Sequence, residues 1–318
     1  MNDVSEKSPE VETQHTKLLI LGSGPAGLSA ALYAARAELA PIVLTGIDLG
    51  GQVALTYTVE NYPGFPEGVG GAELGELFQK QAERFGAKVV FDNAQSVDLS
   101  KRPFKVIADN GIYTADALIV ATGARPNHLE VPGENELIGR GISYCATCDG
   151  AFFKDRNVNV VGGGDSALEE GLFLTRYASS VTVIHRRESL RAGAILQERA
   201  LNNPKMKFMW NTVITDVIGK EKTEAVKIKN IKTGEETVSP TEGVFIFIGH
   251  TPNTQMFEGQ LKMENGYIQV DNQMRTNIPG VYAAGEAADS HFRQVITSAG
   301  MGAAAAIEAT HFLQDEAG

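Results

Sequence analysis

Short apolar runs alternate with segments of helical spacing along this chain, an order that predicts strand–helix–strand units around a parallel sheet. An apolar strand over 17–21 enters a glycine-rich turn, which opens an alanine-rich helix over 25–37 before a second strand at 41–44. The same succession returns far along the chain, as a strand at 157–161, a helix at 168–177 and a strand at 181–184. The pattern therefore predicts an α/β protein with two Rossmann-like dinucleotide-binding units.

The segments between and after these units complete the predicted fold. Apolar periodicity predicts a helix over 74–85 and a strand over 117–120, with antiparallel strands over 88–91, 104–108 and 112–114. Further strands are expected at 208–210, 212–218, 225–230, 236–238, 243–248, 267–270 and 281–284. A helix over 296–312 carries glycine and alanine along its start, so something large is expected to pack closely against it.

Proline and glycine interrupt this pattern twice, once after the strand at 117–120 and once at 249–253. We interpret both interruptions as points where the chain crosses between two domains. Residues 1–16 are polar and acidic, and they are predicted to form a disordered leader.

The first glycine turn, Gly22-Ser23-Gly24-Pro25-Ala26-Gly27, has the spacing of a dinucleotide fingerprint. In such a motif Gly22 makes the tight turn, Gly24 lets a pyrophosphate approach the backbone, and Gly27 lets the helix pack against the strand. The N-terminus of the helix then faces the phosphates. A plain glycine-rich turn is the alternative, but the flanking strand and helix favour a nucleotide site.

The second turn, Gly162-Gly163-Gly164-Asp165-Ser166-Ala167, is followed by a basic cluster. Where an acid would hold a ribose 2′-hydroxyl, the chain has His185-Arg186-Arg187, with Arg191 one turn further on. Arginines at this place accommodate a 2′-phosphate, which predicts NADPH rather than NADH. A solvated basic face is the alternative, and it is the weaker explanation in so acidic a chain. Two such units imply two bound nucleotides, or one working and one degenerate copy.

The chain of 318 residues has a formal net charge of −11 and a sequence pI near 5.1. This acidity argues against a protein that binds nucleic acid or a membrane surface. No apolar run reaches the length of a membrane span, and the leader lacks the pattern of a signal peptide. We therefore expect a cytoplasmic protein of two domains.

The only two cysteines, Cys145 and Cys148, are separated by two residues, and Asp149 follows the second. In a reducing compartment such a pair is more often catalytic or metal-binding than structural. A zinc site needs four ligands, and with no histidine nearby a metal is not expected here. A structural bridge across so short a loop would constrain little of the unfolded chain. The two nucleotide units thus favour a redox couple.

Together these motifs resemble those of the small, bacterial-type thioredoxin reductases, flavoproteins with two dinucleotide-binding domains. The resemblance covers about 18–312, and its most specific part is Cys145-Ala146-Thr147-Cys148-Asp149-Gly150, followed by the second fingerprint with its arginines. Two further stretches agree with that family: Val59-Glu60-Asn61-Tyr62-Pro63-Gly64 and Arg293-Gln294-Val295-Ile296-Thr297-Ser298-Ala299-Gly300.

The resemblance implies FAD as the first nucleotide and NADPH as the second. It implies a discontinuous FAD domain, 17–123 and 249–318, and an NADPH domain over 124–248 that carries the cysteines. The FAD contacts would come from Gly22, Ser23, Gly24, Pro25, Ala26, Thr45, Gly46, Gly50, Gly51, Gln52, Asn61, Ala121, Thr122, Gly123, Gly285, Glu286, Arg293, Gln294 and Val295. The NADPH contacts would come from Gly162, Gly164, Asp165, Ser166, His185, Arg186, Arg187 and Arg191.

One position departs from the family pattern. The family usually has aspartate after the glycine at 285, in contact with the ribityl chain of the flavin. This chain has Glu286, which is one methylene longer. FAD is still expected to bind, because Gly285, Arg293 and Gln294 agree with the pattern.

The resemblance also implies a relay in which NADPH reduces FAD, FAD reduces the Cys145–Cys148 disulfide, and the dithiol reduces thioredoxin. Cys145 would attack the substrate, Cys148 would lie against the flavin and Asp149 would supply a proton, although the two cysteine roles could be exchanged. Since the cysteines and the NADPH turn share one domain, that domain is expected to rotate between two positions. A homodimer is implied as well.

Two other functions are compatible with parts of the sequence. One is a flavoprotein that reduces a different disulfide carrier or a peroxiredoxin-like partner. The other is a redox-sensing nucleotide-binding module without turnover, against which the Cys145–Asp149 stretch argues.

Overall fold

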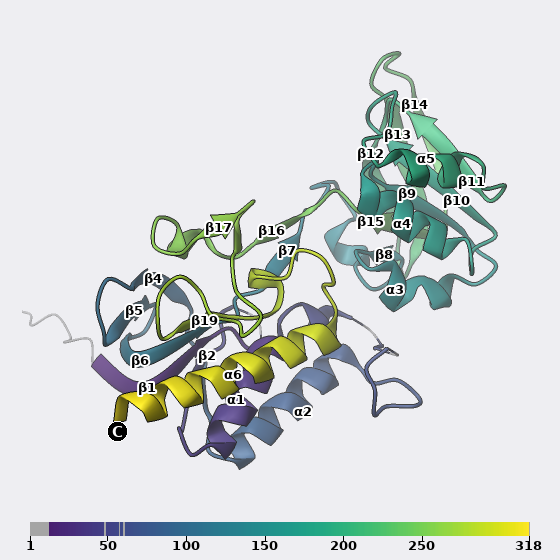
Figure 1. Ribbon diagram of the computed structural model, residues 1–318. Coiled ribbons are helices and arrows are strands. Elements are labelled where there is room, and N and C mark those ends of the chain that lie inside the picture. Colours follow the sequence, from purple (N-terminus) through teal and green to yellow (C-terminus); the bar gives the residue numbers. More distant parts are fainter. Residues whose placement is uncertain (1–12, 48, 57, 60, 318) are drawn as a thin grey trace, which may run out of the picture. The chain divides into compact units, whose positions relative to one another are not determined.

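The computed structural model describes residues 13–47, 49–56, 58–59 and 61–317 (Figure 1). The chain divides into two compact units. Unit 1 comprises Met1–Ala54, Val69–Arg125 and Pro252–Gly318, and unit 2 comprises Leu55–Gly68 and Pro126–Thr251. Most of the leader that was predicted to be disordered, residues 1–12, and Glu60 of the motif quoted above lie outside the described residues.

Unit 1 is built on a mixed sheet with the strand order β3-β2-β1-β6-β5-β4, in which β19 also pairs with β6. Strands β1, β2, β3, β6 and β19 run parallel, whereas β4 and β5 are antiparallel to their neighbours. The strands are β1 (Thr13–Leu21), β2 (Ile42–Leu44), β3 (Lys88–Val90), β4 (Ala94–Asp98), β5 (Phe104–Ala108), β6 (Ile112–Val120) and β19 (Val281–Ala283).

Strand β1 shows how the sequence builds the layers of this unit. Its side chains alternate between the two faces of the sheet, because successive residues of a strand point to opposite sides. Leu18 and Ile20 pack with the alanines of α1 (Pro25–Arg36) and α6 (Val295–Ala317). Leu19 and Leu21 pack on the other face, with residues of β5 such as Phe104. A third helix, α2 (Gly71–Arg84), packs beside α1 (Figure 1).

Three details of unit 1 differ from the sequence prediction. Strand β1 begins at Thr13 inside the predicted leader, since Thr13–Thr16 pairs with Ile112–Ala115 of β6. Strand β3 is parallel to β2 rather than antiparallel, because the intervening α2 makes a crossover connection. Strand β4 was not predicted, because its sequence Ala94–Asp98 is largely polar and exposed.

Unit 2 repeats the same layering around a fully parallel sheet of order β11-β10-β9-β15-β8. Helices cover one face, and the antiparallel strands β12 and β13 cover the other, with β14 paired to the outer edge of β13. The bounds are β8 (Ile142–Ser143), α3 (Ala146–Asp149), β9 (Asn157–Val161), α4 (Asp165–Leu174), β10 (Ser180–His185), α5 (Ala194–Leu201), β11 (Met206–Trp210), β12 (Thr212–Gly219), β13 (Thr223–Asn230), β14 (Glu236–Pro240) and β15 (Gly243–Ile246).

Two short strands, β7 (Ala124–Pro126) and β16 (His250–Pro252), pair with each other and contain two of the points at which the chain passes from one unit to the other. A small hairpin of β17 (Met263–Glu264) and β18 (Tyr267–Ile268) follows in unit 1. The predicted α/β class with two Rossmann-like units is thus confirmed. Within the described ranges, no helix combines the length and the apolar character needed to cross a membrane.

Candidate redox and nucleotide sites

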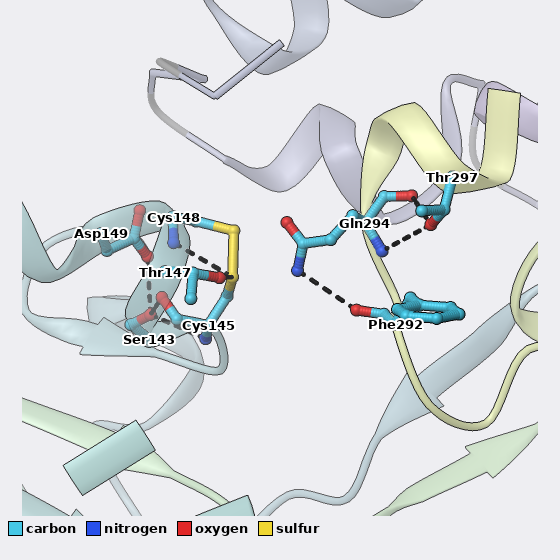
Figure 2. Close-up of a disulfide and its surroundings, with 8 residues drawn as sticks. All are labelled: Ser143, Cys145, Thr147, Cys148, Asp149, Phe292, Gln294 and Thr297. Atoms are coloured by element: carbon cyan, nitrogen blue, oxygen red, sulfur yellow. Dashed lines mark hydrogen bonds between the residues drawn. A yellow bond between two sulfur atoms is a disulfide. The ribbon is translucent and has the colours of Figure 1, made fainter. Parts of the chain in front are cut away.

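The two cysteines form a disulfide at the start of the short helix α3 in unit 2 (Figure 2). Their Cα atoms are 5.3 Å apart. Cys145 is the N-cap of α3, and its Sγ accepts a hydrogen bond of 3.2 Å from the backbone N–H of Cys148. An N–H donor at a helix start stabilises negative charge, so this position favours a thiolate on Cys145 once the bond is reduced.

Asp149 closes α3, and Ser143 holds its carboxyl group (Figure 2). The Ser143 hydroxyl donates to Asp149 Oδ2 at 2.6 Å and accepts from the backbone N–H of Cys145 at 3.1 Å. Burial raises the pKa of Asp149, and the hydrogen bond from Ser143 offsets part of that rise. The carboxyl group therefore keeps a proton to a higher pH than an exposed aspartate would. Ser143 was not predicted, because no motif marks the residue two positions before such a cysteine.

The residue before the disulfide is anchored by a buried acid. Tyr144 donates its hydroxyl proton to Glu134 Oε1 at 2.8 Å, and the same hydroxyl lies 3.0 Å from His128 Nδ1. Glu134 is only 1% exposed, and its two carboxylate oxygens also accept the backbone N–H groups of Leu129 and Glu130. This network fixes the backbone that leads into Cys145.

In unit 1, the glycines of the first turn are explained by different physical causes. Gly22 has a φ of +109°, and a Cβ there would stand 2.1 Å from the carbonyl oxygen of Ala121. A Cβ on Gly27 would stand 1.9 Å from the carbonyl oxygen of Gly22. Gly24, the N-cap of α1, has no atom closer than 4.0 Å to such a Cβ. Packing explains the first two glycines, whereas Gly24 leaves backbone open at the helix N-terminus, as a phosphate group requires.

A second group of predicted residues gathers around this turn. Ser23 donates its hydroxyl proton to the carbonyl oxygen of Thr45 at 3.0 Å. A Cβ on Gly51 would stand 3.0 Å from the Cα of Gly24, so the 45–52 loop and the turn lie in close contact. Unit 1 thereby brings Ser23, Gly24, Pro25 and Ala26 together with Thr45, Gly46, Gly50, Gly51 and Gln52.

Thr122 tests independently whether the residues of unit 1 fit FAD. Its hydroxyl is buried and has no hydrogen-bond partner within the described part of the chain. Buried hydroxyl groups are rarely left unpaired in folded proteins. The residue stands between Ala121 and Gly123, just after the end of β6. A polar group such as that of FAD fits this place.

Glu286 follows Gly285, which packs against Ala26 of α1. Burial raises the pKa of Glu286 to about 7; the charge of Arg293 opposes this shift and that of Asp289 adds to it. Asp289 accepts the backbone N–H groups of His291, Phe292 and Arg293, and so shapes the turn that leads into α6.

The other predicted FAD residues lie in two places. Gln294 precedes Val295, the first residue of α6, and its side-chain amide donates to the carbonyl oxygen of Phe292 at 3.3 Å (Figure 2). Asn61 lies in the stretch Leu55–Gly68, which belongs to unit 2, whereas all the other predicted FAD residues belong to unit 1.

The second turn shows the same division among its glycines. Gly162 has a φ of +147°, and a Cβ there would stand 2.5 Å from the carbonyl oxygen of Phe247. Gly164, the N-cap of α4, has no atom within 4 Å of such a Cβ. Asp165 and Ser166 begin the helix. Both glycine turns therefore leave the backbone open at the N-terminus of their helix, at Gly24 in unit 1 and at Gly164 in unit 2.

The basic cluster lies beside this second turn. His185 ends β10 and is only 4% exposed, whereas Arg186, Arg187 and Arg191 are exposed. Burial lowers the pKa of His185; the hydrogen bond to the Ser189 carbonyl opposes this shift, and the charges of the three arginines add to it. The histidine is therefore neutral at pH 7, and the positive charge of the cluster comes from the arginines.

Unit 2 carries both a disulfide and a dinucleotide-type turn, and unit 1 carries a second such turn. These features together define a nucleotide-dependent disulfide oxidoreductase. The chain belongs to the pyridine nucleotide-disulphide oxidoreductase family, whose model matches residues 16–302. It is 50% identical to the thioredoxin reductase of Rickettsia bellii over 304 residues, 94% of this chain and 98% of the relative. It is 48% identical to that of Streptomyces coelicolor over 301 residues, 93% of each chain.

A solved structure agrees with these relatives. The crystal structure of thioredoxin reductase from Streptococcus pyogenes superposes with a TM-score of 0.90 at 41% identity, covering 96% of this chain and all of that one. The resemblance stated from the motifs is thus confirmed, and so is the expectation of an oxidoreductase. The individual nucleotide contacts stay predictions.

Proposed function

We propose that this protein is a cytoplasmic thioredoxin-disulfide reductase that uses NADPH and FAD. The observation that carries the proposal is the Cys145–Cys148 disulfide, held in the unit whose dinucleotide turn lies beside a segment with three exposed arginines. The names of the relatives support thioredoxin as the electron acceptor, so a different carrier is not favoured. We further propose an FAD domain of 17–123 and 249–318, and an NADPH domain of 124–248.

The residues of unit 1 fit FAD. The open backbone at Gly24 suits the pyrophosphate, and the unpaired Thr122 hydroxyl suits a polar group of the bound cofactor. When bound, FAD takes a hydride from NADPH and delivers two electrons to a disulfide. In unit 2, Gly164 and the arginines fit the pyrophosphate and the 2′-phosphate of NADPH.

The cysteines then carry out thiol–disulfide exchange. The Cys145 thiolate, stabilised by the N–H of Cys148, attacks one sulfur of the thioredoxin disulfide, forms a mixed disulfide with it and displaces the other thioredoxin sulfur as a thiolate. The Cys148 thiolate then attacks Cys145 Sγ, which restores the Cys145–Cys148 bond and releases the thioredoxin sulfur that was held in the mixed disulfide. Because burial raises its pKa, Asp149 stays protonated to a higher pH than an exposed aspartate. It can therefore donate a proton to the thioredoxin thiolate that is displaced.

The decisive experiment follows NADPH oxidation in the presence of oxidised thioredoxin. The purified protein is expected to be yellow, to bleach with NADPH and to reduce thioredoxin, whereas Cys148→Ser abolishes turnover because no intramolecular disulfide can form. Thr147→Ser is the matched control within the same helix: it keeps the hydroxyl that lies 3.4 Å from Cys145 Sγ, and it is expected to turn over. A colourless protein, or a Cys148→Ser variant that turns over like the parent, would contradict the proposal.

We also propose a homodimer, the commonest symmetric assembly of soluble proteins. Sedimentation equilibrium of the yellow protein measures it directly, and a monomer at micromolar concentration would contradict it.

A further inference from the structure

The three arginines of unit 2 lie on an irregular stretch between β10 and α5, residues 186–193, which we call the arginine segment. Within the described part of the chain, none of the three forms a salt bridge with a carboxylate. The positions of the three arginines therefore depend on the contacts that fix the backbone of the arginine segment.

Three hydrogen bonds tie this backbone to the second glycine turn and to the end of β10. The N–H of Arg191 donates to the carbonyl oxygen of Gly163 at 2.7 Å. The N–H of Gly193 donates to Asp165 Oδ1 at 2.7 Å. The imidazole of His185 lies with Nε2 3.0 Å from the carbonyl oxygen of Ser189. The two side chains involved, Asp165 and His185, thus hold the segment near its middle and at its end.

His185 is fitted to this task rather than to contact with a ligand. Its ring is buried and packs directly against the backbone of Gly163, where a Cβ would stand 2.3 Å from the imidazole Cε1. A carbonyl oxygen can only accept, so the neutral ring carries its proton on Nε2 and donates it to Ser189. Gly163 is glycine because this ring occupies the space above it.

Asp165 is fitted in the same way. It is the first residue of α4, and its carboxylate reaches the N–H of Gly193, the N-cap of α5. A carboxylate that accepts a backbone N–H at a helix start forms a charge-assisted bond, which is stronger than one between neutral groups. Asp165 thereby joins the start of α4 to the end of the arginine segment.

We propose that Asp165 and His185 are positioning residues that set the preference for a 2′-phosphorylated nicotinamide dinucleotide without touching the phosphate. The inference rests on the proposed use of NADPH. A segment that is already ordered loses less conformational freedom when its arginines close on a phosphate. NADH has no 2′-phosphate, so its binding is largely independent of this ordering.

The test measures the dissociation constants of NADP⁺ and NAD⁺ by calorimetry on the FAD-loaded protein. Asp165→Ala removes the acceptor and is expected to weaken NADP⁺ binding roughly three- to tenfold, the effect of losing one exposed charge-assisted hydrogen bond. NAD⁺ binding is expected to change less than about twofold, because no phosphate contact is lost. Asp165→Asn keeps an acceptor oxygen but loses the charge, so it is expected to weaken NADP⁺ binding less than Asp165→Ala does.

His185→Leu gives a second, independent reading, since it keeps an apolar side chain of similar bulk but removes the donor to Ser189. It is expected to raise the dissociation constant of NADP⁺ more than that of NAD⁺, in the same direction as Asp165→Ala. Unfolding curves of each variant establish that the chain is folded.

Two sets of results would overturn the inference and leave the proposed function intact. In one, Asp165→Ala changes neither nucleotide, or weakens both equally. In the other, Asp165→Asn weakens NADP⁺ binding as much as Asp165→Ala does, which would mean that the acceptor oxygen at this position does not hold the segment. A parent protein without preference for NADP⁺ would instead overturn the choice of NADPH in the proposed function, and this inference with it.

Discussion

At the scale of single residues, the structure separates side chains that the sequence motifs list together. Gly22 and Gly24 both belong to the first fingerprint, yet one is required by the neighbouring Ala121 backbone and the other leaves the helix N-terminus open. His185 and Arg186 are adjacent in the basic motif, yet the first is buried against the backbone of Gly163 and the second is exposed. A motif names positions, and only the environment of each position gives its physical role.

Glu286→Gln is expected to make the flavin-free protein more stable above neutral pH. Burial raises the pKa of Glu286 to about 7, so the folded chain binds more protons than the unfolded chain up to that pH. The stability contributed by the protonated acid is complete below about pH 4.5 and is lost as pH rises through about 7. The glutamine variant avoids this loss, which is on the order of 1–3 kcal/mol.

Urea unfolding of both flavin-free proteins at pH 5 and pH 8 measures this difference. The glutamine variant is expected to gain stability relative to the parent only at the higher pH. A difference that is the same at both pH values would show that the carboxyl group does not titrate between them.

At the scale of elements, the long strands and the two fingerprint helices could be predicted, because apolar runs and glycine turns mark them clearly. Strand β9 has the predicted bounds, Asn157–Val161. Elements with weak patterns were missed: α5 (Ala194–Leu201) has exposed Ile195 and Leu201, and β4 is largely polar. The direction of β3 was predicted wrongly, although the helix expected over 74–85, between the strand at 41–44 and β3, indicates a parallel crossover.

The glycine-rich start of α6 has a definite partner in the structure. A Cβ on Gly302 would stand 2.0 Å from the carbonyl oxygen of Ala26, so the large neighbour expected from the sequence is the backbone of α1 (Figure 1). Backbone cannot move aside as the end of a side chain can. Gly302→Ala is therefore expected to destabilise the protein by about 1–3 kcal/mol or more.

Gly300→Ala is the matched control on the same helix, because no atom lies within 4 Å of its added Cβ. It is expected to be neutral or to stabilise flavin-free protein by up to about 1 kcal/mol, since alanine favours helix over glycine. Thermal unfolding of the two flavin-free variants compares them, and equal melting temperatures would show that α1 and α6 can separate without cost.

At the scale of the whole molecule, the division into two units bears on the mechanism. The disulfide and the second glycine turn share unit 2, whereas the first glycine turn lies in unit 1. Both the disulfide and NADPH must reach one flavin in the proposed relay. The sequence could predict this conflict from the order of its motifs, but no pattern in a chain gives the motion that resolves it.

We expect that unit 2 alternates between two positions during turnover. A crosslink engineered between the two units is expected to abolish steady-state turnover, because it holds the molecule in one position. One half-reaction, either bleaching of the flavin by NADPH or its reoxidation through the disulfide, should persist in a stopped-flow measurement. A crosslinked protein with normal turnover would rule out the alternation.

The open backbone at Gly24 and Gly164 has a consequence for how this protein can fail. Among the residues that the structure describes, an added methyl group meets no atom within 4 Å at Gly164 and none closer than 4.0 Å at Gly24, so alanine would fit at both positions. Alanine there is expected to leave the fold intact while it crowds a phosphate at the helix N-terminus. The result would be a folded chain with impaired activity, which would still compete for the electron acceptor.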